Sequence, residues 1–381
     1  MKVFLQSIIA QLLLTPYIAY RGQQALPNKW SRLIYVLLCA IELIIFLIGY
    51  IFSDHIPNDM LVQIQMICNT WFFSCIYIMM PMVVIELIRL SNKRKPWLPQ
   101  YITTHYKATK GILFLTIAVA VSALMVRAYN NVANPIVKHV YINIPKDGGK
   151  LDSVTIAMMS DTHIGEIITR KYVEKFVKLC NAQNPDLVVF VGDIIDYEVL
   201  YAEKGKVEEV LQQLHAPMGV YAVNGNHEYR ANIEAKRRWI EKSGLMLLSD
   251  SVVALADSSF YLIGRDDMVN YMRAPLQELM HPLDPNKPSI IIEHQPESLA
   301  ETAMNKGDLA LHGHTHGGQL WPYTIVINQA FECAYGSYRK GDSQYYVSCG
   351  IGSAGPPYRI GTRSELVMLH ITFDKTKEQT Q

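Results

Sequence analysis

The hydrophobic positions of this chain follow two different patterns. In the first 130 residues, apolar side chains form four long runs with few charges, at residues 3–20, 33–52, 61–88 and 111–129. A helix needs about 20 apolar residues to cross the hydrocarbon of a bilayer. None of these runs shows the polar face that a surface helix of a soluble protein needs. We therefore expect residues 1–130 to form a transmembrane region of four helices.

After residue 130 the pattern changes to short apolar runs that alternate with amphipathic stretches. Short branched runs are typical of buried strands, and the stretches between them have helical periodicity. This alternation predicts an α/β domain built from layers of helices and sheets, at residues 137–373. A polar linker is expected at residues 130–135. The expected strands lie at residues 139–144, 153–159, 186–191, 219–223, 245–248, 252–255, 260–263, 289–292 and 309–311, and the expected helices at residues 169–183, 202–214, 231–243 and 297–304.

The charges predict how the chain lies in the membrane. Residues 1–130 hold 11 Lys and Arg against 4 Asp and Glu. This basic part is also the apolar part, so we expect no nucleic-acid partner. The loops after the first three runs contain three, zero and six basic residues. Because basic loops stay in the cytoplasm, we expect a multipass protein of the cell membrane whose second half lies outside the cytoplasm.

The first apolar run has a second interpretation, as a cleaved signal peptide. Its end lacks the small residues of a cleavage site, so we expect the run to be retained as a helix.

Five short polar clusters follow predicted strands and carry the candidate chemistry. Parallel strands end at one edge of a sheet, where α/β proteins bind their ligands. Carboxylate, amide and imidazole groups suit divalent ions such as Mn²⁺, Fe²⁺ or Zn²⁺. Residues two apart on an extended chain share a face, so a pair such as Asp161 and His163, or His314 and His316, can bind one ion. The clusters are Asp161–His163, Gly192–Asp196, Gly225–Glu228, Glu293–Pro296 and His312–His316.

The five clusters resemble the motifs of the calcineurin-like metallophosphoesterase superfamily, complete and in order over roughly residues 150–320. The resemblance implies a four-layer α-β-β-α sandwich and a binuclear centre with two divalent ions (Mn, Fe or Zn). It implies that His227 is the catalytic histidine near the leaving group, with Glu228 and Asp196 behind the ligands. We place His312 there too, rather than among the ligands. By position, one ion would be bound by Asp161, His163, Asp193 and His316, and the other by Asp193, Asn226, His294 and His314, with Asp193 as the bridge.

The charges of such a centre suit a phosphate ester. Two divalent ions, two aspartates and a bridging hydroxide leave one positive charge, which attracts a phosphoryl oxygen. The two metals stabilise the attacking and leaving oxygens, the hydroxide is the nucleophile, and His227 can protonate the departing oxygen.

Two further segments refine the resemblance. Gly350–Arg359 resembles a Gly-rich segment of the membrane-associated or secreted branch, in which Arg359 would contact the phosphate; the alternative is a turn with a surface arginine. Protein Ser/Thr phosphatases of the superfamily have Arg-Gly after the second Asp of the Gly-Asp motif. Here Tyr197 and Glu198 follow Asp196, which argues against phosphoprotein substrates.

We therefore expect a membrane-bound, metal-dependent phosphoesterase that hydrolyses phosphate mono- or diesters, with a lipid-linked substrate as one option. One alternative is a cytoplasmic-side pyrophosphatase of a nucleotide-linked lipid. Another is a membrane sensor that binds metal or phosphate without turnover. The sequence leaves open the oligomeric state and whether Cys333 and Cys349 form a disulfide.

Overall fold

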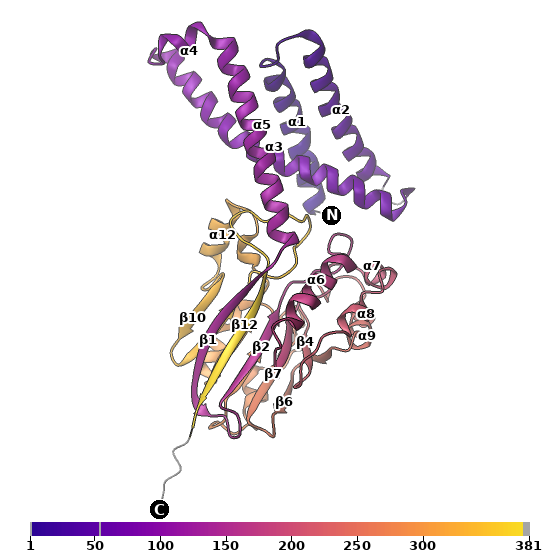
Figure 1. The fold of residues 1–381 in the computed structure, drawn as a ribbon, viewed down its shortest axis with the longest axis vertical. Coiled ribbons are helices and arrows are strands. Elements are labelled where there is room, and N and C mark those ends of the chain that lie inside the picture. The colour runs from indigo at the N-terminus through magenta and orange to yellow at the C-terminus, as the bar shows by residue number, and fades with distance from the viewer. Residues whose placement is uncertain (1, 53–54, 376–381) are drawn as a thin grey trace, which may run out of the picture. The chain divides into compact units, whose positions relative to one another are not determined.

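The computed structural model describes residues 2–52 and 55–375. The chain divides into two compact units, Met1–Arg127 and Ala128–Gln381, and we describe each by itself (Figure 1).

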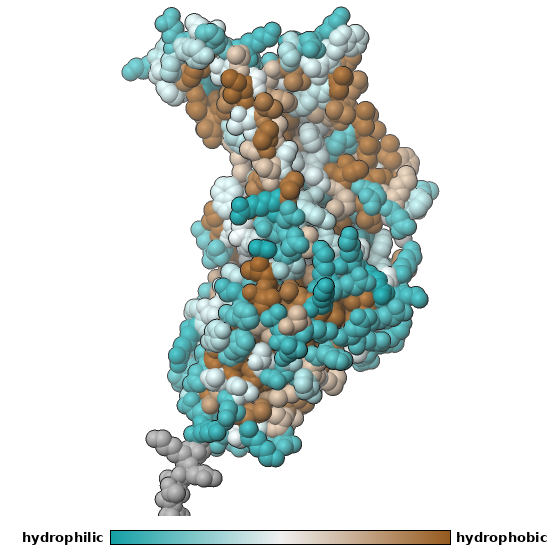
Figure 2. All heavy atoms as spheres, in the orientation of Figure 1, coloured by the Kyte–Doolittle hydropathy of each residue, from teal (hydrophilic) through white to brown (hydrophobic). Residues whose placement is uncertain are grey.

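The first unit is helical. Three described helices are long and apolar enough to cross a membrane, over Lys29–Ile51, Asp59–Arg94 and Tyr106–Ala133. Brown hydrophobic residues cover these helices in Figure 2, and at most 17% of each apolar window is buried, as expected for surfaces that face lipid. The first run forms a helix where expected but is not among these three, so the count of four spans stays a prediction. The helices are α1 (Lys2–Gln23), α2 (Lys29–Ile51), α3 (Asn58–Arg94), α4 (Gln100–Thr104) and α5 (Tyr106–Ala133).

The prediction of a polar linker at residues 130–135 is wrong. Helix α5 continues to Ala133, and strand β1 (Ile136–Asp147) begins three residues later. Val132 is fully buried in the core of the second unit, and the Asn131 side chain donates a hydrogen bond of 3.0 Å to the Arg359 carbonyl. The polar residues of this segment therefore have partners within the second unit, and they do not form a free tether.

The second unit contains two six-stranded sheets, with the orders β1-β12-β2-β3-β4-β5 and β10-β11-β9-β8-β7-β6. In the first sheet β2, β3 and β4 are parallel, and in the second β7, β8 and β9 are parallel. The remaining strands are β2 (Ser153–Met159), β3 (Leu187–Val191), β4 (Val220–Val223), β5 (Met246–Leu248), β6 (Ser251–Leu255), β7 (Phe260–Gly264), β8 (Ser289–Ile292), β9 (Leu309–His312), β10 (Gly336–Lys340), β11 (Ser343–Val347) and β12 (Glu365–Asp374).

Side chains that alternate along the strands divide the core into clusters. In β3, Val188 and Phe190 belong to one cluster, and Leu187, Val189 and Val191 belong to another, because successive side chains of a strand point to opposite faces. The second of these clusters contains side chains from both sheets. The first cluster joins the first sheet to helices, and a third cluster does so for the second sheet. The helices are α6 (Arg170–Asn181), α7 (Leu200–Lys204), α8 (Glu208–Leu211), α9 (Ile233–Lys242), α10 (Leu276–Met280), α11 (Leu299–Met304) and α12 (Tyr323–Ala330), with short 3₁₀ turns at Pro296–Ser298 and His316–Gly318.

One expected helix is interrupted. Residues 202–214 were expected as a single helix, but the structure has α7 and α8 with a break between them. Lys206 has a φ of 48° there, which a continuing right-handed helix does not allow.

Candidate metal centre

The polar clusters lie where strands of the two sheets end. Asp161 and His163 follow β2, Asp193 follows β3, His294 follows β8, and His316 comes shortly after β9. Backbone hydrogen bonds tie the first two loops together, because the amide of His163 donates to the carbonyl of Asp193 at 3.0 Å. The two sheets thus bring together residues that are up to 155 positions apart in the chain.

The backbone of these loops is strained. Asp161, His163, Asp193, His314 and His316 all have φ between 48° and 72°. A left-handed conformation costs a residue other than glycine of the order of 1–3 kcal/mol, and such residues cluster at functional sites. Five left-handed residues in one cluster therefore indicate a functional site.

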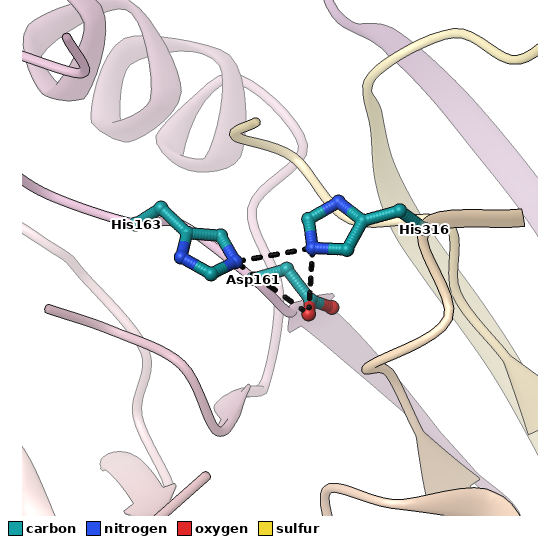
Figure 3. Close-up of side chains that lie close together, drawn as sticks. All are labelled: Asp161, His163 and His316. Atoms are coloured by element: carbon teal, nitrogen blue, oxygen red, sulfur yellow. Dashed lines mark hydrogen bonds and ion pairs between the residues drawn. The ribbon is translucent and has the colours of Figure 1, made fainter. Parts of the chain in front are cut away.

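The first ligand group consists of Asp161, His163 and His316 (Figure 3). Both imidazoles turn Nε2 inward, and these two nitrogens are 3.0 Å apart. His316 Nε2 is also 3.3 Å from Asp161 Oδ1. Two ring nitrogens and a carboxylate oxygen that converge in this way offer a divalent ion three donor atoms.

The second ligand group consists of Asp193, His294 and His314. The Nδ1 of His294 lies 2.8 Å from the Val191 carbonyl, which can only accept, so Nδ1 carries the proton. The buried Nε2 of His294 has no hydrogen-bond partner among the residues that the structure describes, and it faces Asp193 Oδ2 at 3.1 Å. Asn226 Oδ1 joins this group, 2.9 Å from His314 Nδ1. This donor set fits a second divalent ion.

Asp193 lies beside both groups. Its Oδ2 is 3.1 Å from His294 Nε2 in the second group and 3.7 Å from His163 Nε2 in the first. A side chain at Gly225 would collide with the Asp193 carboxylate, so that position must remain glycine for the loops to approach. The structure therefore places one carboxylate between two sets of metal donors.

Burial and charge set the protonation of the ligands. Burial and the nearby His163 lower the pKa of His316 to about 4, and burial and His294 lower the pKa of His314 to about 4. Burial opposes ionisation of Asp161, but the neighbouring His316 and His294 hold the pKa of that carboxyl below its usual range. Burial opposes the charged forms of His294 and His163 as well, but Asp193 raises the pKa of the first imidazole and Asp196 that of the second. Neutral imidazoles and ionised carboxylates are the forms that bind metals, so an ion would displace protons from these two histidines.

His227 lies at the edge of both groups. Its Nδ1 is 2.8 Å from the Asp196 carbonyl and 2.9 Å from the Asp196 carboxylate, and its Nε2 is 3.9 Å from Asp193 Oδ2. The ring also meets His163 edge-on, with centroids 4.5 Å apart. The His227 Nε2 is near enough to Asp193 and His163 to be a ligand itself, so geometry alone leaves two roles open.

Comparison with known proteins decides the family. A model of the calcineurin-like phosphoesterase family matches residues 154–318. An uncharacterized metallophosphoesterase of Aquifex aeolicus is 30% identical over 227 residues, which cover 57% of this chain and 85% of that protein. The chain belongs to the metallophosphoesterase family. This membership supports the predicted activity, that of a metal-dependent phosphoric ester hydrolase.

Two further relatives align with this metallophosphoesterase over more residues than the family model does. A transmembrane protein with metallophosphoesterase domain from Danio rerio is 30% identical over 278 residues, which cover 68% of this chain and 62% of that protein. The uncharacterized metallophosphoesterase Cj0846 of Campylobacter jejuni is 29% identical over 278 residues, 71% of this chain and 72% of that protein. With the three apolar helices, the first of these relatives supports a membrane protein.

Glu228 organises the loop of the metallophosphoesterase that carries Asp193. Its buried carboxylate accepts hydrogen bonds from four amides, those of Asp193, Ile194, Ile195 and Gly225, at 2.7–3.0 Å. Asp196 faces both His163 and His227, at 3.2 and 2.9 Å. His312 is fully buried and stacks on Tyr345, with ring centroids 6.4 Å apart. It belongs to none of the donor groups found among the described residues.

Arg359 is fully buried in the metallophosphoesterase unit. Its guanidinium donates to the carbonyls of Cys349 at 2.6 Å and Gly352 at 2.9 Å, and its Nη2 lies 3.1 Å from His316 Nδ1. These contacts indicate that Arg359 positions His316, while its contact with a substrate phosphate stays a prediction. Cys349 and Cys333 are free thiols in the structure.

Sequence reasoning assigned no role to two buried charged groups beside the centre. Lys236 of α9 is fully buried and donates to the His227 carbonyl at 2.5 Å. Arg265 and Arg273 pair with the buried Glu293, next to His294, at 3.1 and 2.7 Å. A lysine on the apolar face of an amphipathic helix was the signal available for Lys236.

Proposed function

We propose that this protein is a membrane-bound phosphoesterase with a binuclear metal centre, which hydrolyses phosphate mono- or diesters of a lipid-linked substrate outside the cytoplasm. The observation that carries the proposal is the position of Asp193, whose carboxylate faces one set of donors at 3.1 Å and the other at 3.7 Å. A single metal site would need neither a second set of donors nor a shared carboxylate.

The two donor groups would each hold one ion. Asp161, His163, His316 and Asp193 would bind the first, and Asp193, Asn226, His294 and His314 the second. When bound, two divalent ions (Mn, Fe or Zn) supply positive charge for the phosphoryl oxygens and a nucleophile at neutral pH. The clusters that join each sheet to helices and the sheets to each other also support the four-layer α-β-β-α arrangement.

We assign the proton transfer to His227. The Asp196 carbonyl and carboxylate both lie within 2.9 Å of Nδ1, and both can accept the Nδ1 proton. These contacts hold Nδ1 and leave Nε2 on the side of Asp193, 3.9 Å from its Oδ2. A protonated His227 would give its Nε2 proton to the departing ester oxygen, a step that typically contributes a factor of about 10²–10⁴.

The orientation in the membrane does not depend on α1. Basic residues gather around the start of α2 and around the end of α3, and none lies in the loop between these helices. By the positive-inside rule, that loop is outside and the segment before α5 is inside. The second unit, which begins in the last turns of α5, would then lie outside the cytoplasm whether three or four helices cross the membrane.

Turnover by the purified full chain in nanodiscs tests the proposal. We expect hydrolysis of p-nitrophenyl phosphate or its bis-ester, lost with EDTA and restored by Mn²⁺. Asp193→Asn should abolish it. Asp257→Asn should retain it, since this aspartate is exposed and pairs with Lys150 on the surface. A protein that binds two metals but turns over neither ester would be a sensor, and the proposed function would be wrong.

A further inference from the structure

Helix α12 exposes an apolar surface that the described residues of its own unit leave uncovered. None of its residues is buried, and the exposed fractions are 57% for Tyr323, 50% for Ile325 and 53% for Val326, with 46% for the preceding Trp321. The segment from Leu320 to Phe331 contains no charged residue. A contiguous apolar patch of this kind on a soluble surface marks an interaction site.

The segment is anchored on the loop that contains Arg359. The Trp321 amide donates to the Ile360 carbonyl at 2.7 Å, and Leu320 forms bridges with Ile360 and Gly361. A Cβ added to Gly361 would lie 3.3 Å from the methyl of Thr324. The apolar segment therefore packs directly on Ile360 and Gly361, next to Arg359.

The same loop is attached to the last turns of α5. The Arg359 amide donates to the Ala128 carbonyl at 3.1 Å, and Asn131 donates to the Arg359 carbonyl at 3.0 Å. Arg363 Nη2 donates to the Asn134 carbonyl at 3.1 Å. These contacts lie within the second unit. They join the end of α5 to the loop that contains Arg359, on which the α12 segment is anchored.

The charges of α5 place this attachment at the membrane surface. Lys110 and Arg127 bracket 16 uncharged residues. Seventeen steps of 1.5 Å separate the two cations by about 25 Å along the helix, close to the ~30 Å hydrocarbon thickness of a bilayer. Arg127 thus lies near the outer interface, and Ala128, which holds the Arg359 loop, is the next residue.

We propose that α12 and Trp321 lie in the outer interface of the bilayer. Tryptophan and tyrosine prefer this region, because their rings are apolar and their N–H and O–H groups remain hydrated. An uncharged helix with Ile325 and Val326 exposed can bury these side chains about 5–10 Å into the headgroup boundary. Continuity with a membrane-spanning helix selects a lipid surface over a second protein as the occupant.

The first ligand group and the surface of α12 lie close together along the chain. His316 lies four residues before Leu320, and Arg359 contacts both the carbonyl and the Nδ1 of His316, at 3.3 and 3.1 Å. A membrane-bound α12 would hold the first ligand group close to headgroup phosphates. The inferred substrate is an amphiphilic phosphate ester whose apolar part stays in the bilayer; this last step rests on the proposed function, whereas the membrane contact does not.

Fluorescence quenching tests the contact without any turnover. The full chain is placed in nanodiscs that contain lipids brominated near the headgroup, and the difference between the native protein and Trp321→Phe isolates one of the five tryptophans. We expect the Trp321 component to lose at least half of its intensity. An unquenched component would overturn the proposal, and a change in particle mass on Trp321→Phe would instead assign the surface to a second copy.

Kinetics on two substrates test the role of the contact. Ile325→Asp combined with Val326→Asp should lower hydrolysis of dioleoyl phosphatidic acid in the nanodisc at least tenfold and change that of p-nitrophenyl phosphate less than twofold. The matched control, Met272→Asp combined with Met304→Asp, alters two apolar side chains that are 89% and 75% exposed elsewhere on the unit. Equal losses on both substrates, or no loss on the lipid, would refute the inferred role. A native chain inactive on both substrates and on the bis-ester would refute the proposed function, and the quenching result would still stand.

Discussion

Replacement of Glu228 by glutamine should destabilise the metallophosphoesterase unit, although the change in shape is minimal. Each carboxylate oxygen accepts two backbone N–H groups: Oε1 those of Ile194 and Ile195, and Oε2 those of Asp193 and Gly225. In Glu228→Gln one oxygen becomes an NH₂ group. Two buried amides then lose their acceptor and face another donor.

The magnitude follows from the number of bonds lost. A hydrogen bond to a charged group contributes about 1.5–3 kcal/mol, so the loss of two should lower the free energy of unfolding by about 3–6 kcal/mol. In a unit of this size, each kcal/mol changes Tm by about 2–4 °C. We therefore expect Tm to fall by at least about 6 °C.

Thermal unfolding of the full chain in nanodiscs measures this change. Fluorescence of Trp239, 2% exposed in the core of the unit, follows unfolding. EDTA treatment beforehand removes the stabilisation that bound metal would add. The control is Glu209→Gln, because this side chain is 52% exposed and its pair with Arg170 contributes at most about 1 kcal/mol. If Glu228→Gln and Glu209→Gln shifted Tm equally, the four amide bonds would not hold the Asp193 loop as we describe.

Three further predictions concern the centre and the membrane. Elemental analysis of the purified protein should find about two divalent ions per chain, and Asp193→Asn should lose both. Two tightly bound ions in that variant would contradict the bridging role of Asp193. His227→Ala should keep its metal and lose most turnover, with a smaller loss for p-nitrophenol esters than for esters with poor leaving groups; loss of a metal ion would make His227 a ligand, and equal losses would exclude the acid role. In intact cells an impermeant thiol reagent should label a cysteine introduced at Lys375 and not one at Arg94, against a low background because the six native cysteines are buried; the opposite pattern would reverse the topology.

Local patterns were sufficient to predict many elements of the second unit. The strand at Ser153–Met159 was predicted with the bounds that the structure has. Strands that are buried on both faces of a sheet form short, nearly continuous apolar runs, which are easy to recognise in a sequence. The break between α7 and α8 was missed because Gly205 and Lys206 do not stand out from the helical pattern. Strand β12 was missed as well. It pairs with β1 over 200 residues away in the chain, and such a long-range contact leaves no local trace.

The candidate ligands could be named from the sequence because the short clusters after the predicted strands resemble the motifs of the family. What the tertiary structure alone decided is how they meet. Only the packing of two sheets brings Asp161 to within 3.3 Å of His316 and leaves Asp193 beside both donor groups.

The sequence by itself determined the membrane half, the family motifs and the residue types of the centre, since hydrophobicity, spacing and chemistry are local properties. The surroundings of Arg359, Lys236 and α12 were decided by the tertiary structure. Burial and exposure depend on which distant segments pack together: the arginine expected at a phosphate is buried against carbonyls, and a short apolar helix is left exposed.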